Sequence, residues 1–285
     1  MRKKFAVISD VHGNYKAFEA FLEYMEKRPV DGIISLGDYV TDSPYPERTM
    51  ALIRDMRNRY DCCMLRGNRE DYLLNNAGNR EGWKPSSANG TLYYTLQHMT
   101  EEYLDFFASL PTEREYEIEG CQTLYLCHGV PGRVRGNVHE EEGLKEKVMK
   151  ELKYSCLLGG HTHHQETDRL YGRTYINPGS LGFAVDGVGR RAQFAVLTGT
   201  AAEWEAEFIS IPYDVEGYLR DFRESGMDEV GFTLNKAIRK SLLTGINYFY
   251  RCILEIDREA RAAGLASIAD VPQSAWDKLE KKFDL

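Results

Sequence analysis

Short apolar runs and amphipathic segments alternate along the first part of the chain. Residues 5–8, 32–36 and 62–65 are apolar runs bounded by polar turns, and each is short enough to be a buried strand. The segments around Phe18 and Ile53 place apolar side chains three and four residues apart, as an amphipathic helix does. This repeated order of strand, polar loop and helix predicts an α/β fold with helices packed over the sheet.

The same kinds of pattern continue as far as residue 211. Residues 89–110 have the spacing of one amphipathic helix that Pro111 stops, and a charged helix is predicted over 140–152. Asn177-Pro178-Gly179-Ser180 has the composition of a turn. Further strands, the first two of them forming a hairpin, are expected at 115–118, 122–126, 156–158, 174–176, 193–197 and 204–211.

The pattern changes at Pro212. Beyond it the strand signals vanish, and apolar residues over 234–256 recur every three or four positions, which predicts one long helix. A shorter helix is expected around 276–282. We therefore divide the chain into an α/β domain at 1–212 and a helical extension at 213–285 that packs on it. A lid over the site or a dimer contact is the alternative role of the extension.

Polar side chains with metal-binding groups follow most of the predicted strands. Ligands of α/β sheets gather at the carboxyl ends of the strands. In extended or loop segments, side chains two residues apart point the same way, so His161 and His163 can face one site. A set of carboxylate, amide and imidazole groups suits borderline divalent ions, and two ions could share it if one carboxylate bridged them. The strand-end residues are Asp10, His12, Asp38, Asn68, His128, His161 and His163.

Charge and composition restrict the class of protein. The formal net charge of −8 disfavours binding to a nucleic-acid backbone, although bound divalent ions would still allow phosphate chemistry. The first apolar run ends at Asp10, too soon for a signal peptide, and no run approaches the ~20 apolar residues of a membrane span. The six cysteines form no Cys-x-x-Cys pair and fit reduced, buried thiols. We expect a soluble cytoplasmic protein with no membrane partner, for which nucleic acid is a disfavoured partner.

The order of the strand-end residues resembles that of the calcineurin-like metallophosphoesterases. The resemblance spans residues 5–211, and it is greatest for the small bacterial and archaeal phosphodiesterases, which also carry an Asn-Pro-Gly-Ser stretch. It implies a metallophosphoesterase-type α/β sandwich of two mixed sheets flanked by helices, here with a C-terminal helical extension. The family pattern of Asp-x-His, Gly-Asp, Gly-Asn-His-Asp/Glu, His and Gly-His-x-His is matched by Asp10-Val11-His12, Gly37-Asp38, Gly67-Asn68-Arg69-Glu70, His128 and Gly160-His161-Thr162-His163.

The resemblance also implies a dinuclear metal centre. Mn is the favoured ion, with Fe, Zn, Ni and Mg as alternatives. A hydroxide that bridges the two ions would attack phosphorus in line with the leaving group, and would hydrolyse a phosphodiester or phosphoanhydride bond of a small, nucleotide-like substrate. By this resemblance Asp10, His12 and His163 hold one ion, Asn68, His128 and His161 hold the other, Asp38 bridges them, and Asp38, Asn68, Arg69 and His128 are catalytic.

Arg69 departs from the family pattern, which has histidine at this position. That histidine is thought to protonate the leaving oxygen or to stabilise the charge of the transition state. A guanidinium is a poor proton donor but can bind phosphate through paired hydrogen bonds. The alternative is that Arg69 only pairs with Glu70 or another acid at the rim. If no other group donates the proton, we expect a preference for leaving groups that need little protonation, such as phosphoanhydrides and aryl phosphates.

Loop residues supply the candidates for substrate binding and for a substitute acid. Asn14, Arg69 and His164 are the predicted substrate-binding residues. Asn14 stands at the start of a helix, where backbone N–H groups favour anions. Further pocket candidates are Tyr39, Arg66, Trp83 and Lys84, and the histidines that could replace the missing acid are His164, His98 and His139.

Other interpretations stay open. Within the same family, a phosphomonoesterase, a protein phosphatase or a nuclease could share these ligands. From another class comes the interaction scaffold, because relatives such as the retromer subunit have lost metal ligands and serve as binding modules. The presence of all seven expected ligands favours the enzyme. Pocket loops rather than metal ligands select the substrate, so the sequence leaves the natural substrate open, together with assembly into a homo-oligomer.

Overall fold

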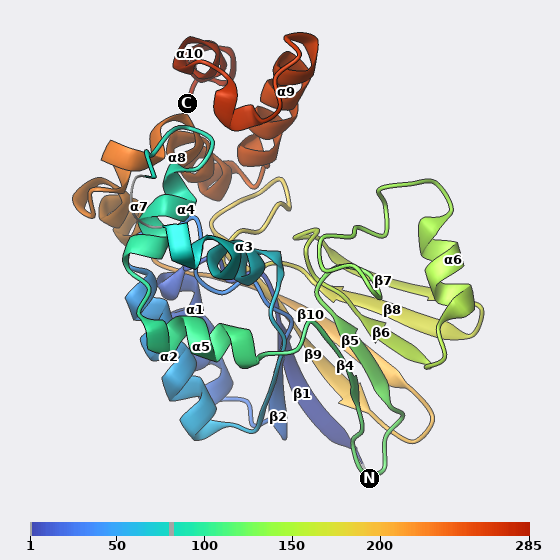
Figure 1. The fold of residues 1–285 in the computed structure, drawn as a ribbon. Helices are drawn as coiled ribbons and strands as arrows, with labels where there is room; N and C mark the ends of the chain where they lie inside the picture. The colour runs from blue at the N-terminus through green and yellow to red at the C-terminus, as the bar shows by residue number, and fades with distance from the viewer. Residues whose placement is uncertain (1, 80–82) are drawn as a thin grey trace.

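A computed structural model describes residues 2–79 and 83–285 of the chain. Two five-stranded mixed sheets form its centre, and helices cover their outer faces (Figure 1). The predicted α/β sandwich is therefore confirmed. The first sheet has the order β10 (Trp204–Pro212), β9 (Arg191–Gly199), β1 (Lys3–Ile8), β2 (Gly32–Ser35) and β3 (Cys62–Met64). The second has the order β4 (Glu113–Tyr116), β5 (Leu124–Cys127), β6 (Cys156–Leu158), β8 (Arg173–Pro178) and β7 (Gln165–Leu170).

The alternation of side chains along β1 connects the two layers of the core. Phe5 and Val7 point to the second sheet, where they share one buried cluster with Leu126. Ala6 and Ile8 point the other way, into the cluster below the helices. The helices of this part are α1 (Tyr15–Glu26), α2 (Pro46–Arg59), α3 (Asn68–Asn76), the short η1 (Ala77–Asn79), α4 (Gly90–Gln97) and α5 (Glu101–Ser109), with α6 (Leu144–Glu151) on the second sheet.

Strand direction determines where the polar loops meet. β1, β2 and β3 run parallel to one another, and so do β5, β6 and β8 in the second sheet. β9, β10, β4 and β7 add antiparallel pairs at the sides. The carboxyl ends of the parallel strands therefore carry their loops to one end of each sheet, as the sequence predicted.

Several predicted elements differ from the observed ones. The single helix over 89–110 is wrong: α4 ends at Gln97, and α5 starts anew because the Thr100 hydroxyl accepts the Tyr103 N–H at 3.3 Å. The charged helix begins later than predicted, at Leu144. β7 was not predicted, because its sequence Gln-Glu-Thr-Asp-Arg-Leu has no apolar alternation, and it is held by pairing with β8. The predicted turn at 177–180 begins inside the end of β8.

The helical extension comprises four α-helices rather than the two predicted. They are α7 (Val215–Glu224), α8 (Met227–Thr244), α9 (Tyr248–Ala262) and α10 (Gln273–Phe283), with the short η2 (Ile268–Asp270) before α10. The expected long helix is split because Gly245, with φ +67°, ends α8, and the Asn247 side chain caps α9.

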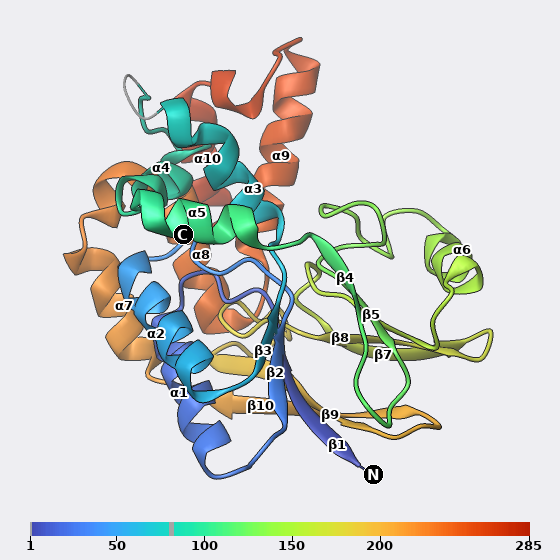
Figure 2. The ribbon, with the colours of Figure 1, turned by 60° about the horizontal axis from the view of Figure 1, so that its bottom comes forward.

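The extension packs partly on the α/β part and partly on itself. An apolar cluster joins Tyr218 and Ile238 to Tyr15 and Phe183 of the α/β part. A second cluster, which includes the buried Trp276, joins α8, α9 and α10. In Figure 2, α9 extends past α3 beyond the edge of the sheets. A lid or dimer role for the extension stays a prediction. None of the helices in the described part of the chain is long and apolar enough to cross a bilayer.

Candidate metal centre

The loops after five strands bring all seven predicted ligands together. Asp10 and His12 follow β1, Asp38 follows β2, Asn68 follows β3, His128 follows β5, and His161 and His163 follow β6. Two groups form, Asp10 with His12 and His163, and Asp38 with His128 and His161, and the ligand atoms within each group lie within 4.8 Å of one another. Asn68 joins the second group, with its Oδ1 3.2 Å from His128 Nε2.

Two carboxylates lie between these groups. Asp38 Oδ2 is 3.8 Å from His12 Nε2 and 3.4 Å from His128 Nε2, so one oxygen faces an imidazole of each group. Asp10 Oδ1 is 3.2 Å from His163 Nε2 and 3.9 Å from His128 Nε2. Asp38 thus lies between the two groups, and Asp10 borders both groups as well.

Backbone carbonyls orient two of the imidazoles. His128 Nδ1 lies 2.9 Å from the Leu36 carbonyl oxygen, and His163 Nδ1 lies 2.7 Å from that of Phe183. A carbonyl can only accept, so each Nδ1–H donates to it, and each Nε2 faces the ligand group. This second contact is the kind that fixes the orientation of metal-binding histidines.

The residues present fit divalent cations. Asp10 Oδ1 is buried and has no hydrogen-bond partner among the described residues, which is costly for a carboxylate unless positive charge compensates it. Burial lowers the pKa of His128, but Asp38 and Asp10 outweigh it and raise that pKa to about 10. The negative charge that attracts a proton to His128 would equally attract a cation. Burial and the neighbouring His128 lower the pKa of His161 to about 4, which leaves a neutral imidazole able to bind metal.

The backbone at the centre is strained. Five of the seven ligands have a positive φ in the left-handed region, which is uncommon for residues other than glycine and costs on the order of 1–3 kcal/mol each. Such conformations persist only where the surroundings hold them, and they cluster at functional sites. The five residues are Asp10 (φ 54°), His12 (φ 44°), Asp38 (φ 60°), His161 (φ 66°) and His163 (φ 62°).

Glu70 holds the loops after β2 and β3 together. Its carboxylate accepts the backbone N–H groups of Asp38, Tyr39 and Gly67, each at 2.8 Å. Gly67 is required at this point, because a Cβ there would lie 2.2 Å from Asp38 Oδ1. Glu70 is therefore a structural residue of the centre, and it does not pair with Arg69.

Arg69 pairs with Asp42, a residue that sequence reasoning missed. Arg69 Nη2 lies 3.1 Å from Asp42 Oδ2, and the same oxygen is 3.5 Å from His12 Nδ1. The Thr91 hydroxyl donates to Asp42 Oδ1 at 2.6 Å. Burial raises the pKa of Asp42, but Arg69 and His12 outweigh it and hold the pKa well below its usual range. The only signal in the sequence was a carboxylate four residues after Asp38, in the same loop.

Three predicted pocket residues have structural roles instead. Asn14 is fully buried and both ends of its amide bind backbone, Oδ1 accepting from Ala17 and Nδ2 donating to Gly182, so the predicted substrate contact gives way to helix capping. Tyr39 is also buried, and its hydroxyl donates to a backbone carbonyl. Arg66 pairs with an acidic side chain of α3 and binds two carbonyls near the end of α5.

The remaining candidates lie apart from one another. Trp83 packs edge-on against Tyr93, with ring centroids 5.9 Å apart, and Lys84 is exposed. His98 Nδ1 lies 2.8 Å from the Tyr94 carbonyl oxygen, and His139 pairs with Glu166 at the surface. His164 is exposed directly after the ligand His163, so it stays a candidate for contact with substrate.

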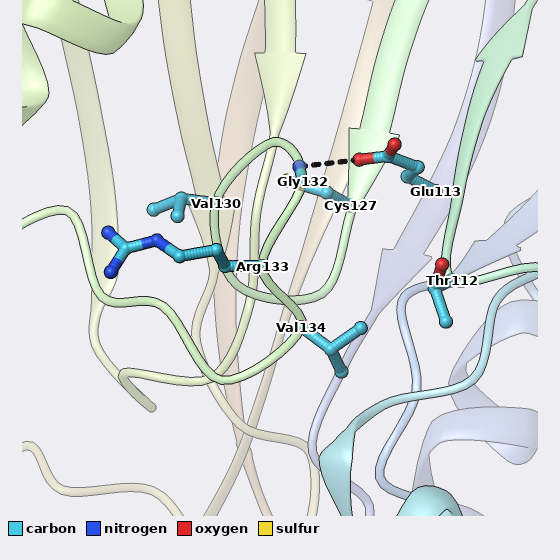
Figure 3. Close-up of a pocket in the computed structure, with 7 residues that line it drawn as sticks. All are labelled: Thr112, Glu113, Cys127, Val130, Gly132, Arg133 and Val134. Atoms are coloured by element: carbon cyan, nitrogen blue, oxygen red, sulfur yellow. Dashed lines mark hydrogen bonds between the residues drawn. The ribbon is translucent and has the colours of Figure 1, made fainter.

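A small pocket lies behind the loop that follows β5 (Figure 3). Its volume is about 60 Å³, enough for a few water molecules and far below the size of a ligand pocket. The Gly132 N–H donates to Glu113 at its edge, and none of the seven ligands lines it. The pocket is therefore too small for a nucleotide-like substrate and lies apart from the candidate metal centre.

Comparison with known proteins establishes the family. The model of the calcineurin-like phosphoesterase superfamily domain matches residues 4–201. The chain belongs to the calcineurin-like phosphoesterase superfamily. The resemblance in the sequence motifs is thereby confirmed, and membership of this superfamily supports a metal-dependent hydrolase.

Three similar proteins come from two archaea and a bacterium. An uncharacterized protein of Methanocaldococcus jannaschii is 27% identical over 232 residues, which cover 76% of this chain and 90% of that protein. A hypothetical protein of Pyrococcus horikoshii has a similar structure, with a TM-score of 0.71, 20% identity, and coverage of 85% of this chain and 98% of that one. A metallophosphoesterase from Sphaerobacter thermophilus has a TM-score of 0.66 and 25% identity, and covers 86% of this chain and 100% of its own. The likeness thus extends beyond the matched domain into the helical extension.

Proposed function

We propose that this protein is a dinuclear metal-dependent phosphoesterase that hydrolyses phosphodiester or phosphoanhydride bonds of a small, nucleotide-like substrate. The observation that carries the proposal is the position of Asp38 Oδ2, which faces His12 of one ligand group and His128 of the other. A carboxylate shared in this way suits two adjacent divalent ions. When bound, such ions polarise a phosphoryl oxygen and lower the pKa of water.

The residues of the chain bind and orient the reacting groups. Asp10 and Asp38 supply negative charge for the cations. Arg69 uses Nη2 for its contact with Asp42, so other N–H groups of its guanidinium remain to bind a phosphoryl oxygen. Arg69 keeps its proton throughout the usable pH range, so it stabilises charge but does not protonate the leaving group.

The proposed cations are two Mn ions, with Fe, Zn, Ni and Mg as alternatives. The donors are carboxylate oxygens, one amide oxygen and imidazoles, with no thiolate, a set that suits borderline and hard divalent ions. The proposed partner is a small phosphorylated substrate. A basic surface for nucleic acid is not expected in a chain of net charge −8.

Metal content and hydrolysis together test the proposal. We expect the purified protein to retain up to two divalent ions per chain, measured by elemental analysis. After loading with Mn, it should hydrolyse bis-p-nitrophenyl phosphate, and a chelator should abolish that activity. Protein that binds two ions but cleaves no phosphodiester, phosphoanhydride or phosphomonoester would favour the interaction scaffold. Cleavage of phosphomonoesters or phosphoproteins alone would favour the phosphatase alternative.

Arg69→His should change how the rate depends on the leaving group. Histidine can donate a proton and arginine cannot, so the variant should gain most with substrates whose leaving groups have a high pKa. A protonating group contributes about 10²-fold or more at such substrates. The measurement is kcat/KM for a series of aryl and alkyl phosphodiesters. If kcat/KM depends on the leaving-group pKa in the same way in wild type and variant, residue 69 has no role in protonation of the leaving group.

A further inference from the structure

Four side chains beside the metal centre alternate aromatic and cationic character. The Arg69 guanidinium carbon lies 5.3 Å from the ring centroid of Phe249 and 5.8 Å from that of Tyr72. The Arg135 guanidinium carbon lies 5.1 Å from the same Tyr72 ring. We call Phe249, Arg69, Tyr72 and Arg135 the rim ladder. It joins three separate parts of the chain, namely α9, α3 and the loop after β5.

One member of the rim ladder, Arg69, lies next to the candidate ligands. Arg69 directly follows the ligand Asn68, and its backbone N–H donates to Asp38 Oδ1 at 2.8 Å. Tyr72 comes four residues after Asn68 on α3, so the two side chains lie on the same side of the helix, one turn apart. Arg135 belongs to the loop that starts at His128. Within the rim ladder, Arg69 is therefore the member next to the ligands. Arg135 is the exposed member, and it packs against the Tyr72 ring.

The two arginines of the ladder differ in charge balance. Arg69 is paired with Asp42, whereas Arg135 is exposed, and within the described part of the chain no carboxylate lies within ion-pairing distance of it. Its neighbour Arg133, by contrast, pairs with Glu140. An arginine stacked on an aromatic ring keeps the N–H groups at its edge free, and these match the oxygens of a phosphate. Arg135 is therefore an unneutralised positive group beside a site for phosphoesters.

We propose that Arg135 forms a second anion subsite next to Arg69, and that it binds a phosphate linked to the scissile phosphate that Arg69 contacts. This proposal rests on the proposed function and narrows its substrate class to phosphoanhydrides with at least two linked phosphates, such as nucleoside polyphosphates. Tyr72 is a positioning residue that holds the plane of the Arg135 guanidinium. Phe249 of α9 holds Arg69 in the same way, so the helical extension helps to position the arginine at the scissile phosphate.

Binding of a non-hydrolysable diphosphate tests the subsite independently of turnover. The probes are methylenebisphosphonate and methylphosphonate, titrated calorimetrically into the Mn-loaded protein. Arg135→Gln should weaken binding of the bisphosphonate about tenfold, the loss expected for a hydrogen bond between charged groups, and should leave the monophosphonate unchanged. Arg133→Gln is the matched control, because it removes the same charge two residues away, and it should change neither affinity.

Two variants of Tyr72 test whether its ring positions Arg135, because both leave the charge of the subsite unchanged. Tyr72→Phe keeps the aromatic face and should bind the bisphosphonate like wild type, whereas Tyr72→Leu should bind it about threefold more weakly. Equal losses in Arg135→Gln and Arg133→Gln, or an equal loss for both probes, would overturn the subsite. Bisphosphonate binding that depends on Arg135, in a protein that cleaves neither phosphodiesters nor phosphoanhydrides, would contradict the proposed function and support the subsite. If the protein cleaves phosphodiesters but Arg135→Gln binds the bisphosphonate as tightly as wild type, the subsite is overturned and the proposed function is supported.

Discussion

Replacing Asp38 by asparagine should lower kcat/KM for a phosphodiester at least about 10³-fold, which corresponds to about 4 kcal/mol of transition-state stabilisation. Asp38 Oδ2 faces an imidazole of each ligand group, so its charge serves both proposed cations. An amide has the same shape and can still accept the Arg69 N–H at Oδ1, so the fold should persist. The loss should therefore come from missing charge and not from unfolding.

Metal content and thermal unfolding complete the measurement on the Asp38 variant. We expect fewer than two retained ions per chain. The melting temperature without metal should fall moderately, because His128 loses the Asp38 charge that raises its pKa, but the variant should stay folded at the assay temperature. Asp31→Asn is the control, since it neutralises an exposed carboxylate that pairs with Lys3 far from the centre. Full activity with two ions bound in the Asp38 variant would show that the two ligand groups work without a shared carboxylate.

The buried strands could be predicted because their signal is local. The runs that became β1, β2 and β3 are apolar, short and closed by polar turns, and burial on both faces requires that composition. β7 gave no such signal, since its polar residues are held at the edge of the sheet by pairing with β8. The two helices that were expected as single units break at Thr100 and at Gly245. Both carry ordinary capping signals, which apolar periodicity alone overlooks.

The meeting of the seven candidate ligands could also be predicted, because the loops at the carboxyl ends of parallel strands lie at one end of a sheet. The pocket residues could not. Asn14 and Tyr39 present polar groups in the right loops, but tertiary structure supplies backbone partners that occupy them. Asp42 became important only because α4 brings Thr91 against it and α3 brings Arg69. Contacts between distant segments decide such roles, and a single sequence does not display them.

Asp42→Asn should weaken the affinity for metal about 10–100-fold, although Asp42 is not among the seven ligands. Its Oδ2 lies 3.5 Å from His12 Nδ1, on the opposite side of the imidazole from the Nε2 that faces Asp38. A carboxylate at Nδ1 fixes the orientation of the ring and raises the basicity of Nε2. An amide does both less well. The measurement is a competition titration of the metal-free protein with Mn and a chelator of known affinity.

The same substitution should also destabilise the metal-free protein, by about 3 kcal/mol at neutral pH, because it leaves the Arg69 charge without its buried partner. The folded-state pKa of Asp42 lies below its unfolded value. Its contribution to stability is therefore fully present above about pH 4, and it is lost as the pH falls through the folded-state value. Urea unfolding should show a gap between wild type and variant that is constant near pH 7 and shrinks in acid.

A double-mutant cycle with Arg69→Gln isolates the pair. If Asp42 acts through Arg69, Asp42→Asn should cost much less in the Arg69→Gln background, with a coupling energy of about 1–3 kcal/mol. Asp42→Asn should still weaken metal affinity in the Arg69→Gln background, because this effect depends on the contact between Asp42 and His12 and not on Arg69. An equal loss of stability in both backgrounds would mean that Thr91 and His12, rather than Arg69, account for the stabilising effect of Asp42. The cycle thus separates the two roles of one buried carboxylate, one toward the fold and one toward the metal centre.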